Sequence, residues 1–320
     1  MRRPAALAVL LAVPLSLAAA LALGSVELGA TRLSAALFGG GDEVAREIVW
    51  GLRAPRAFAA FACGGLLAVA GALLQILLRN PLADPGILGI SGGAAVGALA
   101  AILAGAGGAG EHAAAFAGAM GAAGLVMLVA ARLGTLDVTR VLLAGVALAA
   151  IFGAVVSVML ALAPAMQLRG MLFWLLGDLS AAGSPAAAWL VLAAVVIAAT
   201  ALGSRLDALA LGRDKAQSLG VHVAAVQATA FVAAAGATVA AVMLAGAIGF
   251  VGLVVPHALR LAGWHAHTAL VPLAAAAGGS LVVVADTIGR TAVPPLELPV
   301  GAILALVGAP VLLVLLARMR

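Results

Sequence analysis

The 320-residue chain has no tyrosine, a single cysteine and a single lysine. Cys63 therefore has no partner for an internal disulfide, and within its apolar run we expect it to be a small core side chain. Lys215 is not part of a Gly-x-x-x-x-Gly-Lys-Ser/Thr phosphate loop, and no other lysine is present to form one. The chain is accordingly expected not to hydrolyse ATP by itself.

Charge is also scarce, since only 9% of the residues are charged. The basic residues outnumber the acidic ones and raise the pI to 11.2, but they are scattered through the polar segments and form no basic face. We therefore expect no nucleic-acid partner. The apolar runs hold almost no ionisable side chain, whereas an ion-coupled carrier keeps acids or histidines at membrane depth. An ion-coupled secondary transporter is thus a weaker alternative, and transport energy is expected from a partner protein.

Apolar residues dominate the chain: 65% of it is hydrophobic and the mean hydropathy is +1.25. This composition predicts an all-α polytopic membrane protein with one permease domain over residues 1–320. The first apolar run is interpreted as an uncleaved span rather than a signal peptide. A short segment, 166–178, is expected to be an interfacial helix with Trp174 at headgroup depth. The ten expected spans are 5–23, 57–78, 87–103, 113–131, 141–162, 186–202, 223–245, 248–261, 269–285 and 300–317.

Loop charges predict the orientation of these spans. With the N-terminus in the cytoplasm, eleven of the seventeen basic residues fall on the inner side and six on the outer side. This topology also places the C-terminus in the cytoplasm. Two halves of five spans each would then be inverted relative to one another, which is a common plan among transporters.

The densest run of charge lies at 204–222, between two apolar runs. Ser204 and Asp207 favour a helix start, Gly212 permits a turn, and Asp214 favours a second short helix that Gly220 ends. Five apolar side chains are expected to leave apolar edges on this charged loop: Leu206, Leu209, Leu211, Ala216 and Leu219. The segment suits a docking surface for another protein, although a solvated loop with two helical turns fits the spacing equally well.

An enzyme is a second alternative, because Gly89-Ile90-Ser91-Gly92 matches the Gly-x-Ser-Gly of rhomboid-type intramembrane serine proteases. Such a protease needs a histidine within hydrogen-bond reach of Ser91, and His257 is the only histidine near the interior of a span. Small residues after a proline-rich turn are the preferred interpretation. His265 and His267 are two residues apart without a third ligand, so we expect solvated loop histidines and no metal site. No catalytic residue and no cofactor are expected.

Several motifs resemble those of FecCD-type permeases, the membrane subunits of ATP-binding-cassette importers for iron chelates, haem and cobalamin. The resemblance covers about residue 50 to the C-terminus. The matching stretches are RAPR at 53–56, LAVAG at 67–71 with Gln75, RNPLADP at 79–85, LGIS at 88–91, LLAGVAL at 142–148, FWLLG at 173–177, LALG at 209–212, AQSLGV at 216–221, GAIGFVGLVVPH at 246–257 with Arg260, Asp286, Arg290, and ELPVG at 297–301.

The resemblance implies ten spans in a bacterial cytoplasmic membrane, two permease copies around a central path, two separate ATPase subunits and a substrate-binding protein outside. It also implies that segment 204–222 couples to the ATPase, through Leu211, Gly212, Arg213, Asp214, Ala216, Leu219 and Gly220. Arg53 and Arg290 would dock the binding protein, and we expect both to project from the outer surface. Arg56 is interpreted as structural. The substrate would be an iron chelate (a siderophore complex or haem) or cobalamin.

Overall fold

The computed structural model describes residues 2–40, 42–132, 138–180 and 182–317, and within these ranges it contains helices and no strand. A π-helical stretch, Glu47–Arg53, and a 3-10 turn, Pro85–Leu88, precede α4 and α5. The α-helices are α1 (Arg2–Ala22), α2 (Ala30–Leu37), α3 (Glu43–Arg46), α4 (Ala54–Leu77), α5 (Ile90–Leu103), α6 (Ala109–Arg132), α7 (Val138–Leu162), α8 (Ala165–Leu176), α9 (Ala186–Ala201), α10 (Gly203–Ala210), α11 (Arg213–Ser218), α12 (Val223–Ala245), α13 (Val251–Leu261), α14 (His267–Thr291) and α15 (Val300–Ala317).

The helices confirm an all-α membrane protein with several spans. Five segments of the described chain are long and apolar enough to cross a bilayer: Glu43–Leu77, Ala109–Val129, Leu143–Leu162, Val223–Ala245 and His267–Thr291. α9 and α10, bent by 61° at their junction, make a sixth candidate. Four shorter apolar helices, α1, α5, α13 and α15, coincide with the remaining predicted runs. The total of ten crossings and the side that each end faces stay predictions.

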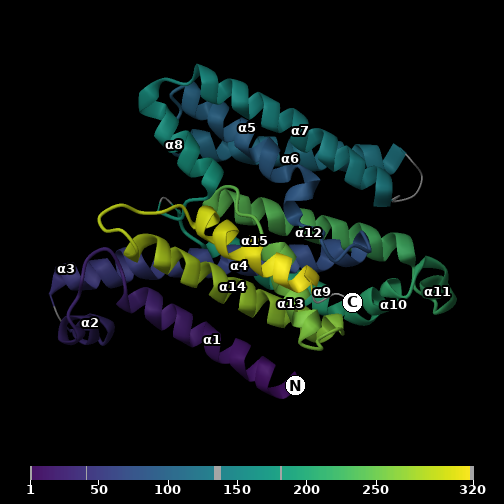
Figure 1. Ribbon diagram of the computed structural model, residues 1–320, viewed down its shortest axis with the longest axis horizontal. Coiled ribbons are helices and arrows are strands. Elements are labelled where there is room, and N and C mark those ends of the chain that lie inside the picture. Colours follow the sequence, from purple (N-terminus) through teal and green to yellow (C-terminus); the bar gives the residue numbers. More distant parts are fainter. Residues whose placement is uncertain (1, 41, 133–137, 181, 318–320) are drawn as a thin grey trace.

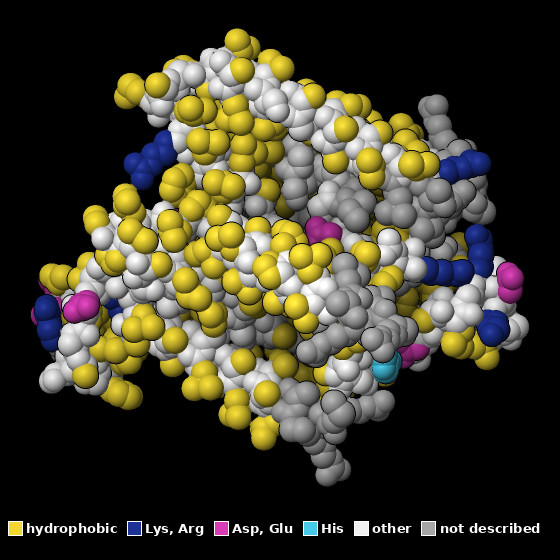
Figure 2. Space-filling model, in the orientation of Figure 1, with side chains coloured by type: hydrophobic (Ala, Val, Ile, Leu, Met, Phe, Trp, Pro, Cys, Tyr) yellow, Lys and Arg dark blue, Asp and Glu magenta, His cyan; other side chains and the backbone are white. Residues whose placement is uncertain are grey.

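The surface is consistent with insertion into a bilayer. Large apolar side chains are exposed on several helices, among them Leu15 on α1, Leu143 on α7 and Leu306 on α15. On the face shown in Figure 2 the charged side chains lie mainly at the two ends, and the middle is largely apolar. Lipid or a further protein must cover such a surface.

α4 is the central helix, and α9, α12, α13 and α14 pack around it. Its sequence is rich in alanine and glycine, and 21 of its residues are buried. A Cβ at Gly64 would lie 2.1 Å from the carbonyl oxygen of Gly278 on α14, so glycine is required for the two backbones to touch. Helices in lipid associate through close packing of small residues, because burial of apolar surface does not by itself favour helix association there.

The helices form two groups (Figure 1). α5, α6 and α7 pack on one another with α8 at one edge, while α1, α4 and α9–α15 form the larger group. α12 joins the groups by contacting both α5 and α6. α2, α3 and the 292–299 connection lie at one end of the molecule, and α10 and α11 lie at the other. We call these the α2–α3 end and the α10–α11 end; the charge count predicts that they are the outer and inner ends.

Two helix starts differ from the predicted runs for identifiable reasons. α5 begins at Ile90 rather than 87, because Pro85 opens a 3-10 turn that Gly89 ends with φ +69°. α13 begins at Val251 rather than 248, because Phe250 before it has φ +68° and Gly246 also has a positive φ. These left-handed residues interrupt helix geometry. The interfacial segment forms α8, and α14 extends six residues beyond its predicted end.

Candidate coupling and docking sites

The coupling segment, 204–222, folds largely as its sequence predicts. α10 and α11 are separated by Gly212, whose φ of +114° is accessible to glycine and strained for other residues. Asp214 lies in the first turn of α11, where its negative charge interacts favourably with the positive end of the helix dipole. Gly220, with φ +78°, follows the end of α11 and turns the chain towards α12. The predicted pair of short helices with glycine turns is therefore present.

The apolar edges of the coupling segment are only partly as predicted. Leu211 and Leu219 are exposed, at 60% and 63%. Leu206, Leu209 and Ala216 are buried, so the prediction that they present an apolar edge to a partner is wrong. Leu206 and Leu209 lie on the face of α10 that packs into the protein, and short helices on a membrane domain need such an anchor. The surface open to a partner consists of Leu211, Leu219 and the charged side chains between them.

A cavity of about 540 Å³ lies beside Leu219 at the α10–α11 end. One wall is formed by α10, with Ser204 and Arg205, and the other by the start of α12, with His222 and Val226. The α10–α11 end therefore has two exposed leucines, Leu211 and Leu219, next to a concave surface. Docking of a partner protein at this end stays a prediction.

At the α2–α3 end, Arg53 and Arg290 are buried, so the expectation that they project from the surface is wrong. Each is 4% exposed. Arg53 donates from Nη1 to the carbonyl oxygens of Leu21 and Ala22, at 2.8 and 2.9 Å. Arg290 donates from Nη2 to the carbonyl oxygen of Ala20, at 2.6 Å. These carbonyls belong to the last turn of α1, which has no helical partners for them and carries partial negative charge.

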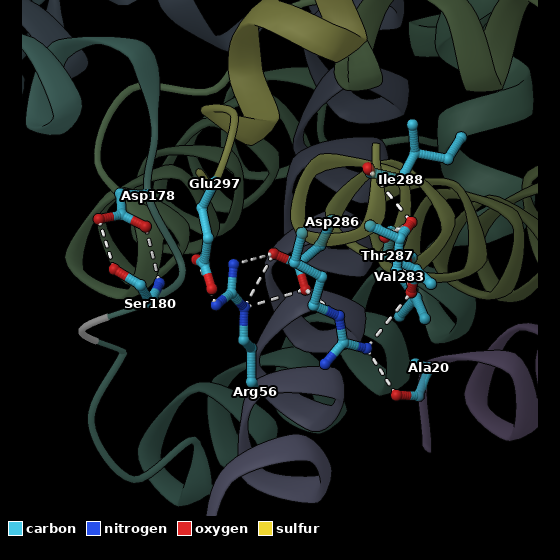
Figure 3. Close-up of polar contacts among 11 residues, drawn as sticks. Ala20, Arg56, Asp178, Ser180, Val283, Asp286, Thr287, Ile288 and Glu297 are labelled. Atoms are coloured by element: carbon cyan, nitrogen blue, oxygen red, sulfur yellow. Dashed lines mark hydrogen bonds and ion pairs between the residues drawn. The ribbon is translucent and has the colours of Figure 1, made fainter. Parts of the chain in front are cut away.

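A third arginine at this end, Arg56, forms an ion network with Asp286 on α14 and Glu297 in the 292–299 connection. Its Nη2 lies 2.8 Å from Asp286 Oδ1, and its Nη1 lies 2.8 Å from Glu297 Oε2. Figure 3 shows the guanidinium group between the two carboxylates. The side chain of Asp286 is 3% exposed and that of Arg56 15%, so the structural role predicted for Arg56 has a geometric basis. We call these three residues the Arg56 network.

The arginines also line a hollow at the α2–α3 end. A cavity of about 380 Å³ is bordered by Arg53, Arg56, Arg290 and Glu297, with Ser180 on the far side. Nearby, Asp42 caps α3 by accepting a hydrogen bond from the backbone N–H of Ala45, at 2.6 Å. That bond, together with the side chain of Arg32, holds the pKa of Asp42 below its usual range.

Inside the protein, Gln75 on α4 joins α13 through a carbonyl that Pro256 leaves free. Proline has no N–H, so the carbonyl of Gly252, four residues earlier, lacks its helical donor. Gln75 Nε2 donates to that oxygen at 3.1 Å, and Arg260 in turn donates to Gln75 Oε1. A Cβ at Gly71 would lie 1.9 Å from the same oxygen, which explains the glycine one turn earlier on α4.

Two further candidates, a Ser91–histidine pair and a metal site, were compared with the described residues. Among the described residues Nε2 of His257 has no hydrogen-bond partner, so this atom is not paired with Ser91. No group of three or more His, Cys, Asp or Glu side chains that could hold a metal ion occurs in the described chain. His267 was expected to be a solvated loop residue, but it is 3% exposed and contacts Asp207. That expectation was wrong.

Two contacts were missed by the sequence analysis. Asp286 and Glu297 were noted only as parts of motifs, and nothing in the sequence paired Asp207 with His267. A carboxylate inside an apolar run, as at Asp286, is the one signal that was available, because such a charge requires a partner in a membrane. Pairing residues that are 230 and 60 positions apart needs the fold itself.

Comparison with known proteins identifies the family. The model of the FecCD transport family matches residues 10–318. The chain is 40% identical over 293 residues, 88% of this chain and 86% of the relative, to the vitamin B12 import system permease protein BtuC of Vibrio cholerae serotype O1. It is 40% identical over 277 residues, 85% of this chain and 84% of the relative, to the protein of that name in Escherichia coli O9:H4.

Solved structures show the same fold. A chain described as an inward-facing conformation of a metal-chelate type ABC transporter has a TM-score of 0.87 and 25% sequence identity, with 99% of each chain covered. The PsaBC structure from Streptococcus pneumoniae, in complex with Fab, has a TM-score of 0.56 at 17% identity. It covers 82% of this chain and 89% of its own, and it indicates a shared fold alone.

Proposed function

The chain belongs to the FecCD transport family, and from this premise we propose that it is the membrane permease subunit of a binding-protein-dependent ABC importer. ATP hydrolysis on a separate subunit drives the import. The observation that carries the proposal is the coupling segment: two short helices present Leu211 and Leu219 beside a cavity, in a chain without a phosphate loop. A permease without its own ATPase site needs such a surface to couple transport to ATP hydrolysis on a partner subunit.

The proposed assembly has two ATPase subunits, a second copy of this permease and a periplasmic binding protein. Residues 1–320 act as one permease domain in a bacterial cytoplasmic membrane, with both termini in the cytoplasm. Most of α7 between Leu143 and Leu162 is exposed. A second copy placed against α7 would form part of the transport path between the two protomers, as expected for a two-fold assembly.

The proposed substrate is cobalamin or an iron chelate. The curated relatives are vitamin B12 permeases, and the structural relative is a metal-chelate type transporter. Both names describe large chelates. The described part of this chain contains no metal-ligand cluster, which suits a path that passes a complete chelate without binding its metal. Cobalamin is therefore the first substrate to test, followed by a ferric siderophore and haem.

The two alternatives have weaker support. A rhomboid-type protease requires a histidine bound to Ser91, and His257 Nε2 has no such contact in the described structure. An ion-coupled carrier requires an acid that can release and bind its proton during transport. Asp286 is a buried acid, but Arg56 holds it with a bidentate ion pair. Because the protease alternative is the one that requires Ser91, we expect Ser91→Ala to leave transport largely intact.

The function can be tested with the purified chain reconstituted alone and together with its ATPase and binding-protein partners. We expect no ATP hydrolysis by the chain alone, and vanadate-sensitive hydrolysis by the complex that loaded binding protein stimulates. Leu219→Glu should sharply lower substrate uptake because it places a charge in the apolar contact. Gln217→Glu, also exposed on α11, is the matched control and should change uptake little.

Two results would contradict the proposal. Vanadate-sensitive turnover by the chain alone, free of contaminants, would show an ATPase site that the sequence lacks. Normal uptake by Leu219→Glu would show that 204–222 is a solvated connector. Ala216→Arg is a poor probe, because Ala216 is buried and a bulky charge there would disturb the fold before any contact.

Docking of the binding protein by Arg53 and Arg290 stays a prediction. Both guanidinium groups now bind α1, so direct docking requires exchange of those carbonyls for acids of the binding protein. Arg53→Gln with Arg290→Gln keeps a side-chain donor for α1 but removes both charges. If the arginines dock the binding protein, its affinity should fall about five-fold for each kcal/mol lost, and its salt dependence should decrease.

Arg46→Gln provides the control for this experiment, because Arg46 is an exposed arginine of α3 at the same end and, among the described residues, its side chain has no hydrogen bond to α1. The docking measurement is the equilibrium affinity of loaded binding protein at low and high salt. An affinity that is the same in wild type and double variant, and insensitive to salt, would leave Arg53 and Arg290 with the single role of holding α1.

A further inference from the structure

The side chain of Asp207 reaches from the coupling segment to the start of α14. Its Oδ1 accepts hydrogen bonds from the backbone N–H of His267, at 3.0 Å, and from Nδ1 of the same residue, at 2.5 Å. His267 is the first residue of α14, and Ala266 at the N-cap position provides no side-chain acceptor. Asp207 therefore supplies the acceptor that α14 lacks, with its charge at the positive end of the helix dipole.

The first turn of α10 is also packed directly on α14. A Cβ at Gly203 would lie 2.6 Å from Thr268 Cγ2 and 2.7 Å from Thr268 N, so only glycine allows this approach. Leu206 and Leu209 are buried on the same helix. α10 is thus fixed on its inner face, while Leu211 at its end remains exposed to a partner.

From this contact α14 runs as one helix, with Pro272 in its second turn, to the other end of the molecule. Its 25 residues span about 37 Å at the rise of an α-helix. Near its far end Asp286 is held by Arg56, and Arg290 donates to α1. Between its two ends α14 packs closely on α4. A displacement of the first turn of α14 is therefore transmitted to its far end by a packed helix rather than by a loop.

We propose that Asp207 is a positioning residue for ATP-coupled transport, which passes displacement of the coupling segment to α14 and through it to the α2–α3 end. The inference rests on the proposed function and adds the route that the motion takes. One carboxylate oxygen accepts two hydrogen bonds from a single residue of α14. Because these bonds are directional and His267 is buried, α10 and the start of α14 move together.

The test uses the complex of this permease with its ATPase subunits and binding protein in proteoliposomes. The measured quantity is the amount of cobalamin transported per ATP hydrolysed. Asp207→Leu removes the oxygen that accepts both hydrogen bonds, at similar side-chain size, and the ratio should fall about five-fold or more. Basal hydrolysis should persist, because Leu211 and Leu219 are unchanged. Asp207→Asn keeps an oxygen acceptor for the amide of His267 and should retain most of the ratio.

A second pair of variants covers the case in which Asp207→Leu does not insert. His267→Leu removes the side-chain donor, and His265→Leu changes an exposed histidine two residues away. The transport ratio should fall in the first and stay at the wild-type value in the second. In addition, a spin label at Val293, which is 49% exposed in the 292–299 connection, should change mobility with ATP and vanadate in wild type and not in His267→Leu.

The outcomes separate the inference from the proposed function. ATP-driven transport by the wild-type complex reports on the function, and a wild type that transports nothing contradicts the function itself. A working wild type with unchanged ratios in Asp207→Leu and His267→Leu overturns the positioning role. A label at Val293 that responds to ATP equally in wild type and His267→Leu overturns the proposed route through α14.

Discussion

Arg56→Leu is expected to destabilise the protein by about 3–5 kcal/mol, because it removes the cation that is hydrogen-bonded to a buried carboxylate. Asp286 is 3% exposed and receives three hydrogen bonds from Arg56, two of them from Nε. Removing Arg56 leaves this buried carboxylate of α14 with the longer ion pair to Arg290, whose Nε lies 3.9 Å from Asp286 Oδ2. Glu297 is more exposed, at 33%, and can turn to water. The measurement is the thermal and denaturant stability of the purified permease in detergent.

Two controls distinguish this loss from a general effect of replacing an arginine. Arg46→Leu changes an exposed arginine of α3 and should alter stability by less than about 0.5 kcal/mol. Arg56→Leu combined with Asp286→Leu removes the hydrogen-bonded pair and leaves Arg290 bound to the carbonyl oxygen of Ala20, so the double variant should regain part of the lost stability. If the double variant is no more stable than Arg56→Leu alone, loss of the ion pair is not the cause.

Gly71→Ala is expected to have the second large effect, although it adds only one methyl group. That Cβ would lie 1.9 Å from the carbonyl oxygen of Gly252, and 2.5 Å from its Cα. Backbone atoms cannot move aside as a side chain does, so α4 and α13 must separate. The separation also stretches the hydrogen bond from Gln75 to Gly252. We expect a loss of about 1–3 kcal/mol or more, measured as reduced yield of monodisperse protein and lower thermal stability.

Gly236→Ala is the matched control, because Gly236 also lies inside a long helix, α12, but a Cβ there meets no atom within 4 Å. Alanine is the better helix former, so this variant should be as stable as wild type or slightly more stable. Equal stability of Gly71→Ala and Gly236→Ala would show that α13 moves freely away from α4, against the close packing described above.

The helices and the coupling segment were predictable from sequence for physical reasons. Apolar runs of about twenty residues specify spans in a bilayer, and the charged residues with glycines at 212 and 220 specify a polar turn region. The family resemblance placed the coupling residues by motif. None of these arguments needs knowledge of which helices are neighbours, so the helical segments and the two short helices α10 and α11 could be predicted without it.

The side-chain environments of Arg53, Arg290 and Ala216 were not predictable in the same way. A charge count assigns a side of the membrane but assumes that arginines in polar segments face water. Whether an arginine is buried depends on the free carbonyls at the end of α1, which no pattern within residues 53–56 reveals. For Ala216, a six-residue helix has too few turns for periodicity to show which face is covered.

The central position of α4 has a consequence for the order of synthesis. α4 lies early in the chain, but α12, α13 and α14, which cover it, are translated late. Arg56 cannot form its ion pair until Asp286, 230 residues later, has been synthesised. Gln75 likewise cannot donate its hydrogen bond until Gly252, 177 residues later, has been synthesised. During translation α4 must therefore remain in the membrane with its glycine-rich face uncovered. A ribosome stalled before α12 would leave this helix with α1 and α9 but without α12, α13 and α14, and we expect such truncated chains to be preferred targets of membrane proteolysis.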